Sequence, residues 1–174
     1  MRRLIAVTLT GMAAAPFAGH AVAAEMTVNV EIPRLDVAEY NRPYLAIWIE
    51  HADQTPVSTL SVWYDQHKRN GEGTKWLKDL RQWWRKAGHD MQFPVDGVSG
   101  ATHAPGQQSL TFSDAAAPLG KLPAGDYQLV VEAARESGGR ELVRVPFHWP
   151  PAAAANTQAK GDHELGSIGV SVKP

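Results

Sequence analysis

Strict alternation of apolar and polar residues marks the first predicted strand of the chain. Val28, Val30 and Ile32 are apolar, the residues between them are polar, and Pro33 ends the run. A period of two residues places the three apolar side chains on one face of an extended segment. The pattern predicts a half-buried β-strand over residues 27–32.

Two apolar runs follow, over residues 44–50 and 57–64, and both are rich in aromatic and β-branched side chains. Side chains of these types suit the pleated surface of a sheet. A short polar connection through Asp53 and Gln54 separates the runs and suits a hairpin. Together with the first strand, these runs predict an antiparallel meander.

The alternation returns in a second predicted hairpin near the C-terminal end. Residues 128–133 and 140–149 form its strands, and the sequence Glu-Ser-Gly-Gly joins them. We expect Gly138 and Gly139 to supply the positive backbone angles of the turn. The Gly-Asp-Tyr sequence that ends at Tyr127 resembles the tyrosine corner of immunoglobulin-like sandwiches.

Weaker patterns predict a short strand over residues 109–113 and a last strand over residues 165–172. Residues 150–164 are rich in alanine, proline and polar residues and are expected to be linker-like. Seven or eight short strands with one helix indicate a mainly β fold. We therefore expect an immunoglobulin-like antiparallel β-sandwich with one amphipathic helix inserted.

That helix is predicted over residues 75–87, where the period of the apolar residues changes from two to that of a helix. Thr74 is available as its N-cap, and Gly88 as its C-terminal stop. The apolar positions are Trp76, Leu77, Leu80, Trp83, Trp84 and Ala87.

The polar positions of this segment hold five basic residues against Asp79, a local charge of about +4. Two interpretations remain open. The basic residues form a solvated face over a buried stripe, or they dock an anion such as a flavin phosphate, a partner protein or an anionic membrane surface.

The N-terminal residues predict a secretory signal peptide over residues 1–24. Arg2 and Arg3 precede a short apolar stretch that contains Gly11 and Pro16, and the run Ala-Val-Ala-Ala ends it. Cleavage after Ala23 or Ala24 leaves a single domain over residues 25–174. The mature protein is expected to be soluble, periplasmic and not embedded in a membrane.

The absence of cysteine and the net charge of the mature chain exclude several classes of function. The chain has no cysteine, which excludes disulfides, a lipoprotein anchor, thiol catalysis and thiolate metal sites. Loss of Arg2 and Arg3 with the signal leaves 15 basic against 18 acidic residues, a net charge of about −3 with histidine neutral. Bulk nucleic-acid binding is therefore not expected.

The heptapeptide Asp-Gly-Val-Ser-Gly-Ala-Thr over residues 96–102 resembles the acceptor motif for covalent flavin attachment. In that motif an acidic residue is followed by a hydroxyl residue, Gly, Ala and a final Thr or Ser. The resemblance implies that a flavin transferase joins flavin mononucleotide (FMN) to Thr102 through a phosphodiester. The unmodified alternative is an ordinary turn-forming loop.

The other motif residues have expected roles in presenting this hydroxyl from an exposed loop. Gly100 and Ala101 give a slim approach to the acceptor. Asp96 and Ser99 are expected to hydrogen-bond the loop backbone and hold its turn. Asp96 has a second candidate role, contact with the metal or the donor in the transferase.

Other chemistries have weaker support. Six histidines of the mature chain are scattered without metal-ligand spacing, so no metal site is predicted. His103 adjoins Thr102 and is a candidate contact of the flavin ring or a phosphate, and an ordinary loop histidine otherwise. Ser99 lacks the Gly-x-Ser-x-Gly elbow of serine hydrolases. No catalytic residue is assigned, and the protein is not expected to be an enzyme by itself.

The Tyr-Leu-Ala-Ile-Trp-Ile-Glu run, the Trp-rich segment, the heptapeptide and the Pro-Ala-Gly-Asp-Tyr hairpin together resemble the family named domain of unknown function 2271. The resemblance covers most of the mature chain. It implies association with PepSY-type membrane proteins and flavin transferases in electron transfer or metal reduction. The expected function is that of a flavin-carrying electron-transfer protein. The alternative is a non-catalytic periplasmic binding module that accompanies a PepSY-type protein.

Overall fold

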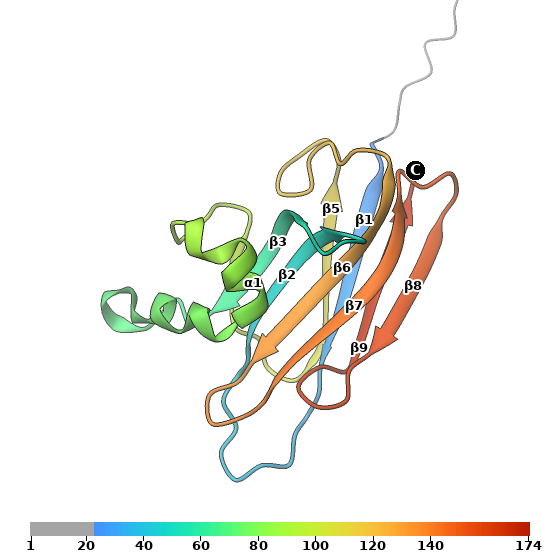
Figure 1. Ribbon diagram of the computed structural model, residues 1–174. Helices are drawn as coiled ribbons and strands as arrows, with labels where there is room; N and C mark the ends of the chain where they lie inside the picture. The colour runs from blue at the N-terminus through green and yellow to red at the C-terminus, as the bar shows by residue number, and fades with distance from the viewer. Residues whose placement is uncertain (1–22) are drawn as a thin grey trace, which may run out of the picture.

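Two β-sheets and one helical segment make up the protein in the computed structural model, which describes residues 23–174 (Figure 1). Most of the predicted signal peptide, residues 1–22, lies outside the described residues. The strands are β1 (Glu25–Ile32), β2 (Tyr44–His51), β3 (Pro56–Tyr64), β4 (Ser99–Ala101), β5 (Gly106–Ser113), β6 (Gly125–Ala134), β7 (Arg140–Trp149), β8 (Ala155–Lys160) and β9 (Ser167–Lys173). The helical elements are η1 (Arg69–Asp79), α1 (Arg81–Lys86) and η2 (Gly88–Asp90).

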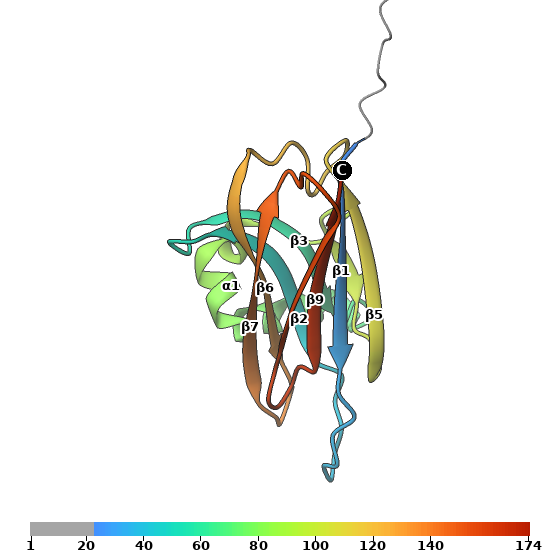
Figure 2. The ribbon, with the colours of Figure 1, turned by 90° about the vertical axis from the view of Figure 1, so that its right-hand side faces the viewer.

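The two sheets stack face to face, which confirms the predicted mainly β sandwich (Figure 2). One sheet has the strand order β5-β1-β9-β8, and the other has the order β4-β3-β2-β6-β7. All pairs of neighbouring strands are antiparallel except β3 and β4, which are parallel.

Period-two patterning explains the core between the sheets. In β1, Val28, Val30 and Ile32 are buried and alternate with partly exposed residues, as the sequence predicts. In the five-stranded sheet, Leu129 and Val131 point into the same core. Apolar side chains of both inner faces thus form one continuous layer, as in other sandwiches.

The outer face of the five-stranded sheet carries a second core beneath the helical segment (Figure 1). Leu77, Leu80 and Trp83 from that segment are fully buried against this face. Trp48 of β2 contributes to the same cluster. Strand β2 is therefore covered on both faces, which explains its nearly unbroken apolar sequence.

The predicted single helix over residues 75–87 is wrong, because the segment breaks at Leu80. This residue has φ −77° and ψ 70°, which separates the 3₁₀-helical η1 from α1. No side chain caps η1, so Thr74 is not its N-cap. The buried carboxylate of Glu132 accepts hydrogen bonds from the backbone N–H groups of Gln82 and Trp83 and anchors the start of α1 on β6.

Both predicted hairpins and the tyrosine corner are present. The Tyr127 hydroxyl donates a 2.9 Å hydrogen bond to the Pro123 carbonyl, the local bond that defines such a corner. Strands β6 and β7 pair along their full length. In their turn, the positive φ of 56° belongs to Ser137, whereas we expected Gly138 and Gly139 to supply it.

The C-terminal part contains one strand more than the sequence predicts. Residues 155–160, within the segment expected to be linker-like, form β8, which pairs with β9. Strand β5 begins at Gly106, three residues before the predicted start. In residues 23–174, no helix is long and apolar enough to cross a bilayer.

Candidate functional site

The first half of the heptapeptide forms a tight turn at the edge of the five-stranded sheet. Gly97 has a φ of 72°, a conformation that glycine adopts without steric cost. The Ser99 hydroxyl accepts a 2.9 Å hydrogen bond from the Val95 backbone N–H, which confirms the expected loop-holding role of Ser99. The Asp96 side chain is exposed on the turn. The turn-holding bonds present are those of Ser99 and the backbone, so the turn-holding role expected of the Asp96 side chain is not observed in the described residues.

The second half of the heptapeptide is a strand, whereas an exposed loop was expected. Ser99–Ala101 forms β4, which runs parallel to β3 over residues 62–64. The Val98 carbonyl accepts a 2.8 Å hydrogen bond from the Val62 N–H and fixes the entry to β4. Gly100 lies against the Trp63 indole, where an added Cβ would come within 2.8 Å of Trp63 Cδ1. Position 100 therefore needs glycine for its packing against Trp63, whether or not a transferase also approaches this strand.

Thr102 follows β4 directly and lies on the wall of a cavity of about 500 Å³, here called the Thr102 cavity. Ala101 lines the same cavity. The cavity also takes residues from three other places along the chain, namely Tyr40, Arg42 and Tyr44, then Tyr64, Asp65 and Lys68, and finally Glu136. The acceptor hydroxyl predicted from the motif is thus next to aromatic rings and two cations.

His103 lies beside this cavity rather than in it. Its ring meets the Trp63 indole edge to face, with ring centroids 4.3 Å apart. Burial lowers the pKa of His103, and the positive charge of nearby Arg42 lowers it further. At neutral pH His103 is therefore an uncharged side chain packed on Trp63, which does not favour a phosphate contact.

Two tyrosine hydroxyls of the Thr102 cavity are buried and poorly satisfied. The hydroxyl of Tyr40 makes no hydrogen bond within the described part of the chain, and that of Tyr44 has only the nearby Asp65 backbone, which acts to lower its pKa. Burial is the largest cause that raises the pKa of each, so both remain protonated donors at neutral pH. Because buried polar groups are normally paired, these hydroxyls are available to a polar ligand.

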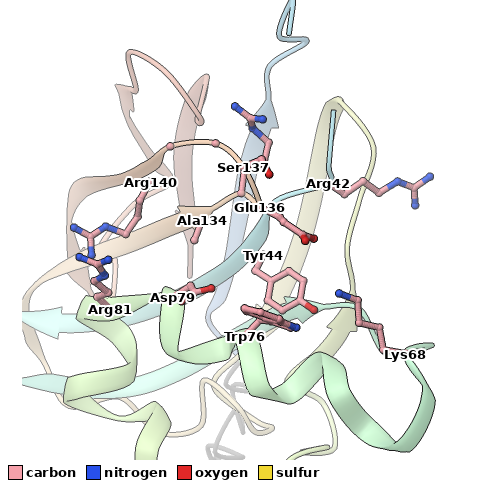
Figure 3. Close-up of a pocket in the computed structure, with 13 residues that line it drawn as sticks. Arg42, Tyr44, Lys68, Trp76, Asp79, Arg81, Ala134, Glu136, Ser137 and Arg140 are labelled. Carbon is pink, nitrogen blue, oxygen red and sulfur yellow. The ribbon is translucent and has the colours of Figure 1, made fainter. Parts of the chain in front are cut away.

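A second hollow, here called the η1 cleft, adjoins the Thr102 cavity. It has a volume of about 440 Å³ and lies between η1 and the β6–β7 turn (Figure 3). Figure 3 shows Trp76 and Tyr44 at its centre, with Arg81 and Arg140 at one end and Arg42 and Lys68 at the other. Arg42, Tyr44, Lys68 and Glu136 also line the Thr102 cavity, so the two hollows share a wall.

The predicted basic face of the helical segment does not form one patch. Lys86 Nζ lies 2.6 Å from a carboxylate oxygen of buried Glu50, and Lys75 pairs with Glu72 at 3.0 Å. Arg81 alone of the five basic residues lines the η1 cleft. Lys75, Lys78, Arg81 and Arg85 are exposed while Leu77, Leu80 and Trp83 are fully buried, which agrees with the solvated-face interpretation. Anion docking stays a prediction, and the other cations of the cleft come from outside residues 75–87.

Sequence reasoning missed the residues around the motif. Tyr40, Arg42, Tyr44 and Lys68 share the cavity of Thr102, Trp76 lines the adjoining η1 cleft, and no local motif links them. Among residues 23–174, no three His, Asp or Glu side chains gather as metal ligands do. The residues present fit a flavin nucleotide, since aromatic surface, cations and buried hydroxyls suit its ring, phosphate and polar edge.

Comparison with known proteins identifies the family of this chain. The family model described as predicted periplasmic protein (DUF2271) matches residues 25–167, from β1 to the first residue of β9. No curated protein and no solved structure matches the chain. The family description agrees with the periplasmic location predicted from the N-terminal residues. The chain therefore belongs to the DUF2271 family of predicted periplasmic proteins.

Proposed function

We propose that the protein is a periplasmic electron carrier with FMN bound covalently to Thr102. The observation that carries this proposal is that Thr102, the last residue of the motif, lines a cavity of about 500 Å³. Arg42 and Lys68 supply positive charge on the same wall, and Tyr40 and Tyr44 supply buried hydroxyls. A ring with a phosphate tail needs this combination of groups.

A partner flavin transferase makes the linkage in this proposal. The hydroxyl oxygen of Thr102 forms a bond to the FMN phosphorus of FAD, the diphosphate bond breaks, and AMP leaves with its bridging oxygen. The hydroxyl proton passes to a base of the transferase or to water, and nothing is oxidised or reduced. The exposed carboxylate of Asp96 is free to contact the transferase's metal or the donor. Its place on a rigid turn keeps it close to the acceptor strand.

The attached flavin supplies one-electron and two-electron transfer, and the chain's own residues hold it. A covalent link suits a periplasmic carrier, because a cofactor that dissociates there is lost. We propose a membrane redox protein of the PepSY type as the electron partner, on the strength of the family resemblance. No residue of this chain is assigned a catalytic role.

Intact-mass measurement tests the attachment. The exported wild-type protein, Thr102→Ala and Thr102→Ser are each produced together with a flavin transferase, denatured and weighed. We expect the wild type and Thr102→Ser to gain the mass of FMN less one water and to keep flavin fluorescence after denaturation. Thr102→Ala is expected to gain neither, because it lacks the acceptor oxygen.

Each other outcome has a defined meaning. A transferase that loads its own natural acceptor in the same cells, but leaves the wild-type protein unmodified, overturns the carrier proposal in favour of a binding module. Flavin retained on Thr102→Ala moves the attachment to another residue. Asp96→Asn tests whether the acidic residue acts on the transferase or on the fold. Reduced loading with unchanged thermal stability indicates contact with the transferase.

A further inference from the structure

The η1 cleft and the Thr102 cavity share one wall, which carries charged side chains and the ring of Tyr44. Arg42, Tyr44 and Lys68 line both hollows, so a group attached at Thr102 meets these three residues before it meets the rest of the cleft. Trp76 lies beyond them, beside Tyr44 (Figure 3). A group attached at Thr102 therefore meets the cations Arg42 and Lys68 first and the indole of Trp76 after them.

The cations at this end have no acidic partners. Neither Arg42 nor Lys68 forms an ion pair within residues 23–174, whereas Arg135 at the rim is paired with Glu164 at 2.9 Å. Glu136 is the one acidic residue common to both hollows in the described structure. Unpaired cations along a concave wall attract an anion, and a phosphodiester carries one negative charge.

Trp76 is exposed in a way that ordinary packing does not explain. Its side chain is 46% exposed, although the neighbouring Leu77 and Leu80 are fully buried. Lys68 Nζ lies 5.7 Å from the centroid of the Trp76 ring, so a cation borders the open indole. An exposed indole in a cleft offers a flat apolar surface for a planar aromatic ligand.

From these observations we infer that the η1 cleft is the binding site of the flavin ring, which lies against Trp76 while Arg42 and Lys68 hold the phosphate. This inference rests on the proposed attachment to Thr102 and adds the residues that position the flavin. The buried hydroxyls of Tyr40 and Tyr44 supply donors for its polar atoms or phosphate oxygens.

Free FMN tests the site without any covalent step. Purified Thr102→Ala protein, made without a transferase, is titrated into FMN, and quenching of the flavin fluorescence gives the dissociation constant. Adding Trp76→Ala is expected to weaken binding about tenfold, the effect of losing one aromatic stacking contact. Adding Lys68→Ala is expected to weaken FMN binding more than riboflavin binding, because riboflavin has no phosphate.

Matched controls show whether these losses are local. Lys160→Ala removes an exposed lysine from β8 in the other sheet, and Lys75→Ala removes one from η1 that is paired with Glu72. Both are expected to leave the dissociation constant within about twofold of the parent value, since surface pairs contribute little. The inference is overturned if the double variant Thr102→Ala, Trp76→Ala binds FMN as tightly as Thr102→Ala does.

The loaded protein gives a second measurement that does not depend on affinity. When flavin is attached at Thr102, stacking on Trp76 quenches its fluorescence, so loaded Trp76→Ala is expected to be several-fold brighter than loaded wild type. Equal brightness with full loading by mass overturns the cleft site and leaves the carrier proposal standing. Absence of loading with tight, Trp76-dependent FMN binding overturns the carrier proposal and makes the cleft a non-covalent flavin site.

Discussion

The two faces of the five-stranded sheet are built in different ways. The inner face packs aliphatic side chains such as Ile47, Leu129 and Val131 against the four-stranded sheet. The outer face packs the indoles of Trp48 and Trp83 beneath the helical segment. The outer face also buries the charged side chains of Glu50 and Glu132, whereas the inner core is built from apolar side chains.

Two glutamates account for this difference. Glu50 is fully buried and accepts hydrogen bonds from Trp48 Nε1 at 2.8 Å and Lys86 Nζ at 2.6 Å. Glu132 is also fully buried and receives the N–H groups at the start of α1. Apolar contact has little directional preference, whereas these bonds fix one orientation. The inner face thus stabilises the sandwich, and the outer face sets where the helical segment, and with it Trp76, lies.

The largest expected effect comes from a cavity in the inner face. Leu129→Ala removes a fully buried side chain of β6, and the free energy of unfolding is expected to fall by about 3 kcal/mol. Urea denaturation followed by circular dichroism measures the change. Because the inner core joins the two sheets, both sheets are expected to unfold in one transition. A separate early transition of the helical segment in this variant would contradict the division of roles.

Removal of the Glu132 carboxylate is the complementary change on the outer face. Glu132→Ala leaves the N–H groups of Gln82 and Trp83 without their acceptor, at a cost of about 2 kcal/mol. Amide hydrogen exchange is expected to accelerate over residues 81–87 and to change little in β1 and β9. Equal acceleration in both sheets would show that the anchor stabilises the whole domain rather than the docking of one segment.

The dependence of stability on pH should differ in sign between two glutamates. Burial raises the pKa of Glu132 above its usual 4.5, because desolvation outweighs its N–H donors. Its folded state binds the proton more tightly, so its contribution is largest below pH 4.5 and is lost as pH rises through the folded pKa. Relative to Glu132→Gln, wild-type stability is therefore expected to fall as pH rises above 4.5. Urea titrations at a series of pH values measure this.

Glu141 provides the opposite case. Burial favours a higher pKa for its carboxyl, but backbone N–H donors that include Asp162, His163 and Leu165 outweigh burial and lower the pKa below 4.5. Its contribution is present above pH 4.5 and is lost as pH falls through the lowered pKa. Glu141→Gln is expected to destabilise the protein at neutral pH and to differ less from wild type in acid. The same sign for both glutamates would contradict their assigned environments.

The smallest expected effect comes from the surface of the helical segment. Lys75 and Glu72 form an exposed ion pair at 3.0 Å on η1. Lys75→Ala is expected to change the free energy of unfolding by at most about 0.5 kcal/mol, because solvent screens exposed pairs. Urea denaturation at low and high salt checks this value. A larger loss would mean that polar anchoring of the segment extends beyond its buried glutamates.

Local pattern predicted the parts of the fold whose burial repeats along the chain. The alternation in β1 and the glycine-containing turn between β6 and β7 located these elements correctly. The helical segment was less predictable, since Leu77, Leu80 and Trp83 keep helical spacing although the backbone breaks between them. Their burial against the sheet determines that backbone, and contacts distant in sequence determine the burial.

Two strands were missed for a related reason. Strand β8 is almost wholly exposed and has no apolar alternation, so its pairing with β9 is the main reason it is extended. Strand β4 has three residues and depends on β3, which lies about 37 positions earlier in the chain. Neither dependence leaves a periodic signal in the local sequence.

The candidate site also contains residues that the local sequence marks and residues that it does not. Thr102 and Ser99 were found because a contiguous motif contains them. Arg42, Lys68 and Trp76 come from separate connections, and only the assembled sandwich brings them to one hollow. A single sequence contains no pattern that relates such residues, so the motif could be recognised from the sequence and the residues that line the hollow beside it could not.

Three of the four sheet edges are poor templates for pairing with another polypeptide. Strand β4 is only three residues long, β7 carries Pro146 where an N–H is lost, and β8 is polar and ends in Lys160. Short, proline-containing and lysine-bearing edges disfavour the addition of a further strand. At these three edges the sandwich is therefore protected against the edge-to-edge aggregation to which open sheets are prone.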